Sequence, residues 1–212
     1  MQSLESYISQ RTLRVKQEHE YSELKIINAG VPQGRVFGPI LYLSYTCNIP
    51  VAENIKLATF ADDTAVLAVG NTIEETTANL QNATDIIHAW TRKWRIKINE
   101  VKSIHVNFTN RKINYHPVEL NNNTIPCKET AKYLGLNLDA KLKWKEHVKK
   151  KTEESKLKYK NMYWLLGRNS QLSIRNKVLV YKQVLKQVWT YGLQLWGCTK
   201  ESNYACLQRF QN

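Results

Sequence analysis

The chain has 212 residues, of which 42% are hydrophobic and 10% aromatic. This composition can bury a core and excludes disorder throughout, and the length suits one ordinary domain or one with a smaller appendage. Residues 1–140 carry 15 basic and 14 acidic side chains, whereas residues 141–212 carry 16 basic and 4 acidic ones. A near-neutral body joined to a basic C-terminal third favours a polyanionic partner such as nucleic acid over a merely solvated face.

The four cysteines form no CxxC pair and have no histidine at metal-ligand spacing. We therefore expect reduced thiols of an intracellular protein, not disulfides or a zinc site. No apolar run reaches membrane-spanning length, and the N-terminus has no signal-peptide pattern. The chain starts with almost no leader and stops in mid-pattern, which suggests a piece of something longer.

The N-terminal part predicts a short helix and then a hairpin over residues 4–28, with alternating apolar residues on either side of a charged link. The loop Gly30–Pro39 follows, with three glycines and two prolines in ten residues. Such a loop is rigid and tightly turned, so a backbone or a ligand can approach it closely. The apolar run Ile40–Tyr45 then predicts a buried helix that ends near Asn48–Pro50.

Two adjacent aspartates, Asp62 and Asp63, separate the β-compatible runs 56–61 and 64–69. The simplest interpretation is a hairpin with both carboxylates at its tip. Carboxylates paired on a rigid hairpin can hold divalent cations over a growing nucleic-acid end. The alternative is a plain polar turn, because aspartate is common in turns.

A helix is predicted after Gly70, where Thr72 and Glu75 have capping-box spacing. Its apolar face predicts packing on the sheet that carries the hairpin, with both tryptophans in the core; this face comprises Ile73, Leu80, Ala83, Ile87, Trp90 and Trp94. Alternating residues in 96–98 and 104–108 predict two strands joined by a link at 99–103. A further strand is expected at Tyr133–Leu138 after a polar loop.

Only helices are predicted after Lys141. The first has a buried stripe and a stop at Gly167; the stripe comprises Trp144, Val148, Thr152, Ser155, Tyr159, Met162 and Leu166. Nine of the twenty residues from 141 to 160 are lysine, so its other faces are cationic. Ser173 is expected to cap a second helix, whose inner face would be Ile174, Val178, Tyr181, Leu185 and Val188. Basic residues interleaved with aromatic ones are compatible with strand binding.

Several segments, taken in order, resemble reverse transcriptases of non-LTR retrotransposons, most closely the jockey-like elements of arthropods. Gly30–Pro39 is similar to their GVPQGSVLGP signature, and Phe60–Asp63 resembles their FADD/YADD box. Asn99–Ser103 resembles their N-x-x-K-T/S segment, and Tyr133–Leu138 their YLG strand, which steadies the primer end. The ends of the chain also fit, in residues 6–15 and in the tail from Tyr191 to Gln211.

The resemblance implies an RNA-directed DNA polymerase of α+β fold. An antiparallel palm with packed helices would span 1–140, and a basic helical thumb with the start of a connecting segment would span 141–212. Asp62 and Asp63 would be catalytic metal ligands for two Mg²⁺ ions about 3.5–4 Å apart. Lys102 would be a general acid or charge stabiliser near the departing phosphate, or else an ordinary exposed loop lysine. The implied partners are an RNA template, a DNA primer or target DNA, and deoxynucleoside triphosphates, with no membrane and no disulfide-linked partner, in the nucleus and cytoplasm.

Three binding sets follow from the same resemblance. The nucleotide and template would lie against Gly30, Pro32, Gln33, Gly34, Arg35, Phe60 and Ala61. The primer grip would be Tyr133, Leu134 and Gly135. The nucleic-acid backbone would be held by Lys145, Lys149, Lys150, Lys156 and Lys160.

The chain also departs from the family pattern. Arg35 stands where serine is usual, Phe37 where leucine is, and Gln187 where proline is. The palm needs a third carboxylate from an upstream strand, yet the sequence has no aspartate before Asp62. We therefore expect the fingers and the first palm strand to be absent and the chain to be inactive alone. A non-catalytic nucleic-acid-binding remnant of a decayed element is the main alternative, and an intron maturase is disfavoured by the YLG strand and the tail at Trp196.

Overall fold

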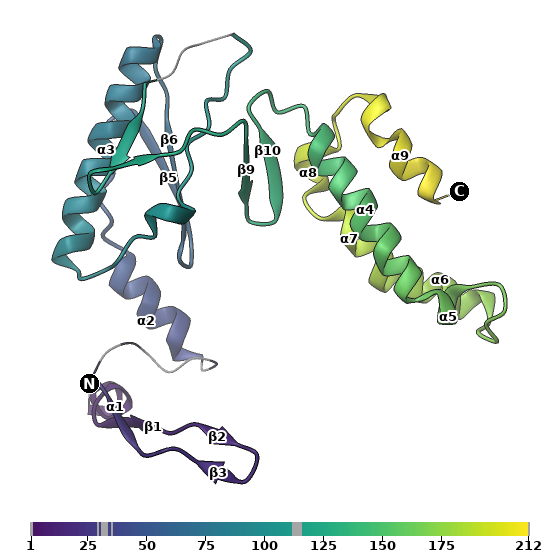
Figure 1. The fold of residues 1–212 in the computed structure, drawn as a ribbon, viewed down its shortest axis with the longest axis horizontal. Helices are drawn as coiled ribbons and strands as arrows, with labels where there is room; N and C mark the ends of the chain where they lie inside the picture. The colour runs from purple at the N-terminus through teal and green to yellow at the C-terminus, as the bar shows by residue number, and fades with distance from the viewer. Residues whose placement is uncertain (1, 29, 31–33, 35, 112–115, 212) are drawn as a thin grey trace. The chain divides into compact units, whose positions relative to one another are not determined.

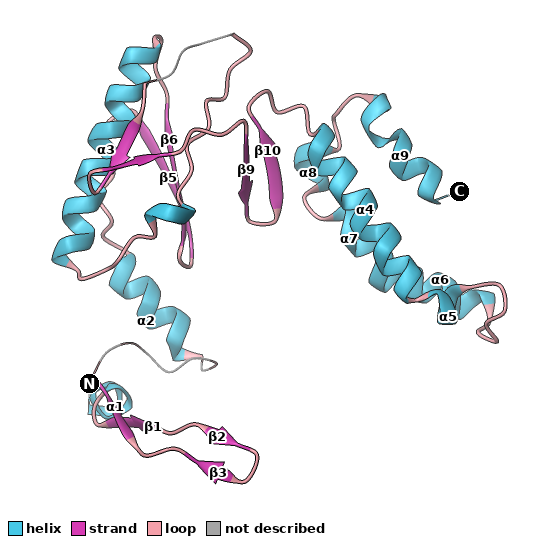
Figure 2. Ribbon diagram, viewed as in Figure 1, coloured by secondary structure: helices cyan, strands magenta, loops and turns pink. Residues whose placement is uncertain are grey.

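A computed structural model describes residues 2–28, 30, 34, 36–111 and 116–211. It mixes helices with small antiparallel strand pairs, which confirms the α+β class at this level (Figure 2). The strands of the described residues pair in five separate two-stranded sheets, and their arrangement as a palm stays a prediction. Contacts divide the chain into two units, residues 1–51 with 56–66, and residues 52–55 with 67–212. The palm–thumb boundary at residue 140 stays a prediction.

The first unit begins with the expected helix and hairpin. Helix α1 (Gln2–Ile8) precedes β1 (Arg11–Leu13), which pairs antiparallel with β4 (Lys25–Ile27), and β2 (Lys16–Gln17) pairs with β3 (Glu20–Tyr21). The Arg11 guanidinium donates to the carbonyl oxygens of Ile8 and Gly30. The base of the hairpin is thereby tied to the start of the glycine-rich loop.

Helix α2 (Phe37–Thr46) includes the apolar run predicted to be helical, but the prediction that it is buried was wrong. Ile40 is 52% exposed and Leu43 59%, and Gly38 is the buried residue of the helix. An apolar run shows only that the side chains are hydrophobic, whereas burial also requires another part of the chain to cover them. The ring of Tyr7 contacts Phe37 edge-on at a centroid distance of 6.0 Å, which joins α1 to the first turn of α2.

The second unit contains α3 (Ile73–Lys93), which starts at the predicted capping box. The backbone N–H of Glu75 donates to Thr72 Oγ1 at 3.1 Å, and the Glu75 carboxylate accepts from the backbone N–H of Asn71 at 2.9 Å. Ala83 is fully buried on the predicted apolar face, while Trp90 and Trp94 are half-buried. Both tryptophans, predicted to lie in the core, are therefore only partly buried.

Helix α3 packs on the hairpin of β7 (Val118–Leu120) and β8 (Asn123–Ile125). The Gln81 amide bonds the backbone of Glu119 twice, accepting from its N–H at 2.8 Å and donating to its carbonyl at 3.0 Å. This contact extends the edge of β7 as a neighbouring strand would. It fixes the helix to the hairpin without a further strand.

The two strands expected in 96–98 and 104–108 were wrong. Residues 96–99 are irregular, and 104–108 contain one parallel bridge between His105 and Cys127. Extending this bridge toward Ser103 would need an N–H on Pro126, and proline has none. Most of the alternating apolar residues of these segments are half-buried, although the backbone does not pair as a strand.

The single strand expected at Tyr133–Leu138 was also wrong, because the segment folds back on itself. Strand β9 (Thr130–Tyr133) pairs antiparallel with β10 (Leu136–Asp139) through a two-residue turn. Leu134 and Gly135 have φ of +46° and +78°. Positive φ at both central residues defines a type I′ turn, which suits the twist of a hairpin.

The C-terminal part is helical, as expected (Figure 1). It comprises α4 (Lys145–Asn161), α5 (Tyr163–Leu166), α6 (Ile174–Val180), a π-helix (Tyr181–Leu185), α7 (Lys186–Thr190), α8 (Leu193–Trp196) and α9 (Glu201–Gln211). Helix α4 lies against α7, α9 and β10. Val148, Thr152 and Ser155 are buried on α4 as predicted, and Val148 forms the core with Trp196 and Leu207.

The Ser173 cap is confirmed, since its Oγ accepts from the N–H of Asn176 at 3.3 Å. The predicted inner face is only partly right: Leu185 is buried, but Ile174 is 81% exposed. The π-helix supplies a physical reason. Its wider turn changes the angular phase, so a 3.6-residue period projected through it misplaces the residues before it.

Candidate catalytic and nucleic-acid-binding site

The two aspartates lie at the tip of a hairpin, as predicted. Strand β5 (Ile55–Phe60) pairs with β6 (Asp63–Ala68), and the connection consists of Ala61 and Asp62. Asp62 lies in the turn, Asp63 is the first residue of β6, and both are exposed. Ala61 has φ of +49°, a left-handed conformation that costs a residue with a Cβ about 1–2 kcal/mol. The hairpin tip is therefore a strained point that presents two carboxylates to solvent.

Tyr42, on α2 of the same unit, lies near enough to Asp62 for its pKa to be affected by the carboxylate charge. Burial raises the pKa of the Tyr42 phenol, and the negative charge of Asp62 raises it further. The phenol therefore stays protonated at neutral pH and remains a hydrogen-bond donor. The sequence pattern did not single out Tyr42, because its proximity to Asp62 depends on tertiary structure.

The chemistry of Asp62 and Asp63 fits a hard divalent cation, because carboxylate oxygens are the ligands that Mg²⁺ prefers. A set of three potential ligands does not gather anywhere in the described residues, whether from His, Cys, Asp or Glu. Two adjacent carboxylates supply only part of a two-metal site. The fit is therefore partial.

The loop expected to face the nucleotide is described only in part. Gly30 and Gly34 have φ of +84° and +74°, and a Cβ at either would meet nothing within 4 Å. Their conformation requires glycine even though space is available. Pro32, Gln33 and Arg35 lie outside the described residues. Phe60, at the end of β5, is 64% exposed.

Lys102 ends a 3₁₀ turn (Glu100–Lys102) in the second unit. The Asn99 side chain accepts from the N–H of Lys102 at 3.2 Å, and the Glu100 carboxylate accepts from Asn121 and Asn123 at 2.6 and 2.8 Å. The turn is thus held at both ends, and the lysine side chain is exposed. Lys102 and the aspartates belong to different units.

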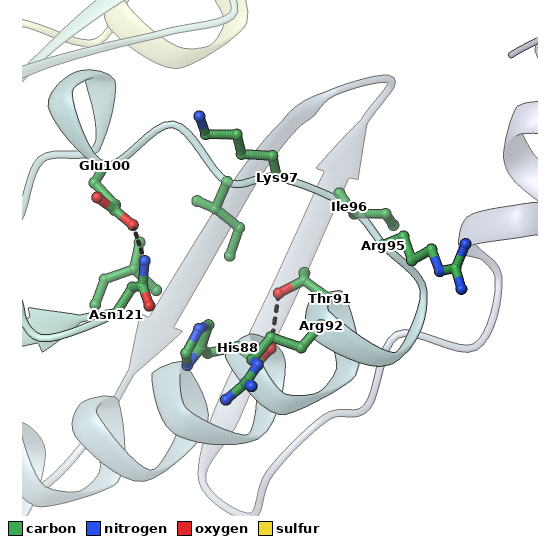
Figure 3. A pocket seen from close by; sticks show the side chains of 10 residues that line it. His88, Thr91, Arg92, Arg95, Ile96, Lys97, Glu100 and Asn121 are labelled. Carbon is green, nitrogen blue, oxygen red and sulfur yellow. Dashed lines mark hydrogen bonds between the residues drawn. The ribbon is translucent and has the colours of Figure 1, made fainter. Parts of the chain in front are cut away.

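A pocket of about 300 Å³ lies between the C-terminal end of α3 and this turn (Figure 3). Figure 3 shows the Glu100 carboxylate turned toward Asn121, while His88 and Arg92 extend from α3. Arg95 and Lys97 also line the pocket. The local surface beside the Lys102 turn is therefore rich in cations.

The predicted primer grip is the tip of the β9–β10 turn. Tyr133 ends β9, and Leu134 and Gly135 form the turn. The Tyr191 hydroxyl donates to the Leu134 carbonyl at 2.6 Å. The structure thereby brings together two segments that the sequence places 57 residues apart, the YLG segment and the Tyr191-Gly192 tail.

All five predicted phosphate-binding lysines on α4 are exposed. At 3.6 residues per turn, four of them fall within an arc of about 60° around the helix axis, so they share one face: Lys145, Lys149, Lys156 and Lys160. Lys150 lies apart and is engaged locally, with its ammonium 3.8 Å from Glu146 and 3.3 Å from Asn137 Oδ1. We call the four lysines the α4 lysine face.

Asp139 places α4 at the end of β10. Its Oδ1 accepts from the N–H groups of Lys141 and Lys143 at 3.2 and 2.9 Å, and its Oδ2 accepts from that of Trp144 at 2.7 Å. One carboxylate therefore satisfies three backbone donors where the strand becomes a helix. Sequence reasoning missed this residue, although an aspartate shortly before a helix is a recognised capping signal.

Residues 2–138 match the reverse transcriptase (RNA-dependent DNA polymerase) family. The chain therefore belongs to this family.

Two named relatives indicate which members of this family the chain resembles. The chain is 36% identical, over 99% of its length, to the probable RNA-directed DNA polymerase from transposon BS of Drosophila melanogaster, and covers 24% of that protein. It is 35% identical over 94% of its length to the RNA-directed DNA polymerase from mobile element jockey of the same species, covering 23% of it. The chain thus spans about a quarter of these relatives. No solved structure matches it. The similarity to jockey-like non-LTR retrotransposon enzymes is confirmed.

No helix of the described residues is long and apolar enough to span a bilayer.

Proposed function

We propose that this chain supplies the metal-binding aspartates, the primer contact and the duplex-holding helices of an RNA-directed DNA polymerase. The observation that carries the proposal is the position of Asp62 and Asp63 at a strained hairpin tip, inside the segment that matches the family. The palm would comprise residues 1–140 and the thumb 141–212. Its substrates would be an RNA template, a DNA primer or target DNA, and deoxynucleoside triphosphates, in the cytoplasm or nucleus.

Each group would have a separate part in nucleotidyl transfer. Bound Mg²⁺ would supply Lewis-acid stabilisation of charge on the reacting phosphate. Asp62 and Asp63 would hold the metal through carboxylate oxygens, and Lys102 would place an ammonium near the departing phosphate. The glycine-rich loop would let a nucleotide approach its backbone, and the turn at Leu134 and Gly135 would support the primer end.

Primer extension tests the catalytic part. With Mg²⁺ and an RNA template, we expect the 212-residue chain alone to give no extension, because two carboxylates do not complete a two-metal site. The matched variant is Asp62→Ala. Extension by the chain that disappears in this variant would support polymerase chemistry and contradict the expected inactivity. Extension that persists in the variant would contradict the metal-ligand role.

Binding of a primer–template duplex tests the α4 lysine face. If its four lysines each contact a phosphate, the logarithm of the association constant falls with the logarithm of salt at a slope of roughly −3.6. Changing all four to glutamine should bring the slope near zero, whereas Lys25→Gln, an exposed lysine in β4, should leave it unchanged. A salt-independent association constant for the unmodified chain would contradict the thumb role.

A non-catalytic nucleic-acid-binding remnant is a second candidate, and the α4 lysine face is the observation that favours it. It predicts the same salt slope but no effect of Asp62→Ala on any property of the bound nucleic acid. A change in Mg²⁺-dependent primer–template affinity on Asp62→Ala would argue for the polymerase instead.

A further inference from the structure

The turn between β9 and β10 is held from outside by one residue of the tail. Tyr191, which follows α7, donates its hydroxyl to the carbonyl of Leu134 at 2.6 Å. A Cβ on Gly135 would lie 3.2 Å from Cε1 of the same ring. The ring and the hydroxyl therefore cover both central residues of the turn.

Gly192, the next residue, packs closely against Leu136, the first residue of β10. A Cβ on Gly192 would lie 2.6 Å from Cδ2 of Leu136, and its φ of +68° is itself unsuited to a side chain. Leu136 is buried. The Tyr-Gly pair thus contacts the hairpin through the ring and hydroxyl of Tyr191 and through the backbone of Gly192, where a side chain would not fit.

Tyr191 is fixed in turn by the helical core. Its carbonyl oxygen accepts from the indole N–H of Trp196 at 3.0 Å, and Trp196 is 2% exposed. The ammonium of Lys151, on α4, lies 5.9 Å from the centroid of the Tyr191 ring. A buried core residue therefore holds the backbone of Tyr191, and a cation lies near its ring.

The turn needs this support because of its own sequence. Leu134 has φ of +46°, a left-handed conformation that is unfavourable for a residue with a Cβ. A tertiary hydrogen bond to the carbonyl of that residue stabilises the unfavourable conformer. Without the bond, the turn can relax to other backbone states.

We propose that Tyr191 is a positioning residue, which sets the conformation of the β9–β10 turn and so the place where a primer end rests against it. The inference rests on the proposed function, in that the turn is taken as the primer contact. Tyr191 acts through Leu134 and Gly135 and need not touch nucleic acid. The thumb helices would thereby determine whether the primer contact is formed.

The test uses the full 212-residue chain and an RNA–DNA primer–template. 2-Aminopurine is placed at the 3′-terminal nucleotide of one primer, and well inside the duplex of a second. We expect Tyr191→Phe to lose most of the fluorescence change at the 3′-terminal probe and to retain the change at the internal probe. Hydrogen exchange of the amides in 134–136 should be about 3- to 10-fold faster, as expected for loss of one hydrogen bond.

Two further variants separate positioning from general stability. Tyr181→Phe removes another tyrosine hydroxyl, one that accepts from Gln211 at 3.0 Å, and should change neither probe nor turn exchange. Gly135→Ala should reproduce the effect of Tyr191→Phe, because its Cβ would crowd the ring at 3.2 Å and its φ of +78° is unsuited to a side chain. Neither Tyr191→Phe nor Gly135→Ala should change the helical circular dichroism.

The outcomes are distinct. If the unmodified chain changes neither probe, the proposed function is overturned. If it changes the 3′-terminal probe and Tyr191→Phe behaves identically, the positioning role is overturned while the proposed function stands. Equal loss at both probes with loss of helical signal would assign Tyr191 a structural role only and would also overturn the inference.

Discussion

Substitution of Asp139 tests how the junction between β10 and α4 is stabilised. The Asp139 carboxylate accepts three backbone N–H groups, from Lys141, Lys143 and Trp144, at 3.2, 2.9 and 2.7 Å. Asp139→Ala leaves all three donors without this partner at the start of α4. Asp139→Asn can retain the two bonds to Oδ1 but places an NH₂ group opposite the N–H of Trp144.

The size of the effect follows from those contacts. Replacing a capping side chain by alanine costs about 0.5–2 kcal/mol, and hydrogen bonds to charged groups contribute about 1.5–3 kcal/mol. Because bonds to one carboxylate are not additive, we expect Asp139→Ala to lower the free energy of unfolding by about 3 kcal/mol. Asp139→Asn should lower it by about 1–2 kcal/mol, since one bond and the charge are lost.

Urea unfolding followed by tryptophan fluorescence measures this difference, because Trp196 is buried in the same helical core. Asp85→Ala is the matched control. Asp85 is exposed on α3 and accepts one hydrogen bond from Gln81 at 2.8 Å, so its loss should cost no more than about 0.5 kcal/mol. A loss for Asp139→Ala no larger than for Asp85→Ala, or smaller than for Asp139→Asn, would refute the reasoning.

Two further predictions concern stability. Burial, and then the nearby charge of Lys151, hold the pKa of His147 below its usual value. The unfolded chain therefore takes up a proton below about pH 6.5 that the folded chain does not. Stability should fall as pH drops from there through the lowered folded pKa, by at most about 1.4 kcal/mol per pH unit. His147→Asn should flatten this slope in a series of thermal melts, and an unchanged slope would count against it. Gly192→Ala should cost about 2–4 kcal/mol in urea unfolding, because both φ and Leu136 oppose a Cβ. Gly34→Ala, with equal φ strain but open space, should cost only about 1–2 kcal/mol; equal losses would show that the contact with Leu136 has no effect.

Local patterns predicted local structure well. The buried stripe of α4 formed at Val148, Thr152 and Ser155 but not at Tyr159, which is 36% exposed. The capping box at Thr72 and the Ser173 cap depend on residues within a few positions of each other, and both formed. The hairpin at Asp62 and Asp63 formed for the same reason. Each of these features is decided by backbone donors and side chains that are neighbours along the chain.

Features that depend on distant partners were missed. The apolar run in α2 gave no sign that Ile40 and Leu43 would be exposed, because burial is a property of what covers a helix. The YLG segment was interpreted as a strand, although its glycine equally suits a type I′ turn. The contact of Tyr191 with Leu134 spans 57 residues and has no local signal.

Asp62 is proposed to lie in the metal site of an RNA-directed DNA polymerase. The most direct measurement is primer extension on an RNA template by the jockey polymerase of Drosophila melanogaster with its aligned segment replaced by this chain, to which it is 35% identical. We predict Mg²⁺-dependent extension by this chimera, its loss to background in Asp62→Ala, and its retention in the Asp85→Ala control. Equal extension with and without Asp62, or no extension by the chimera where the parent extends, would contradict the claim.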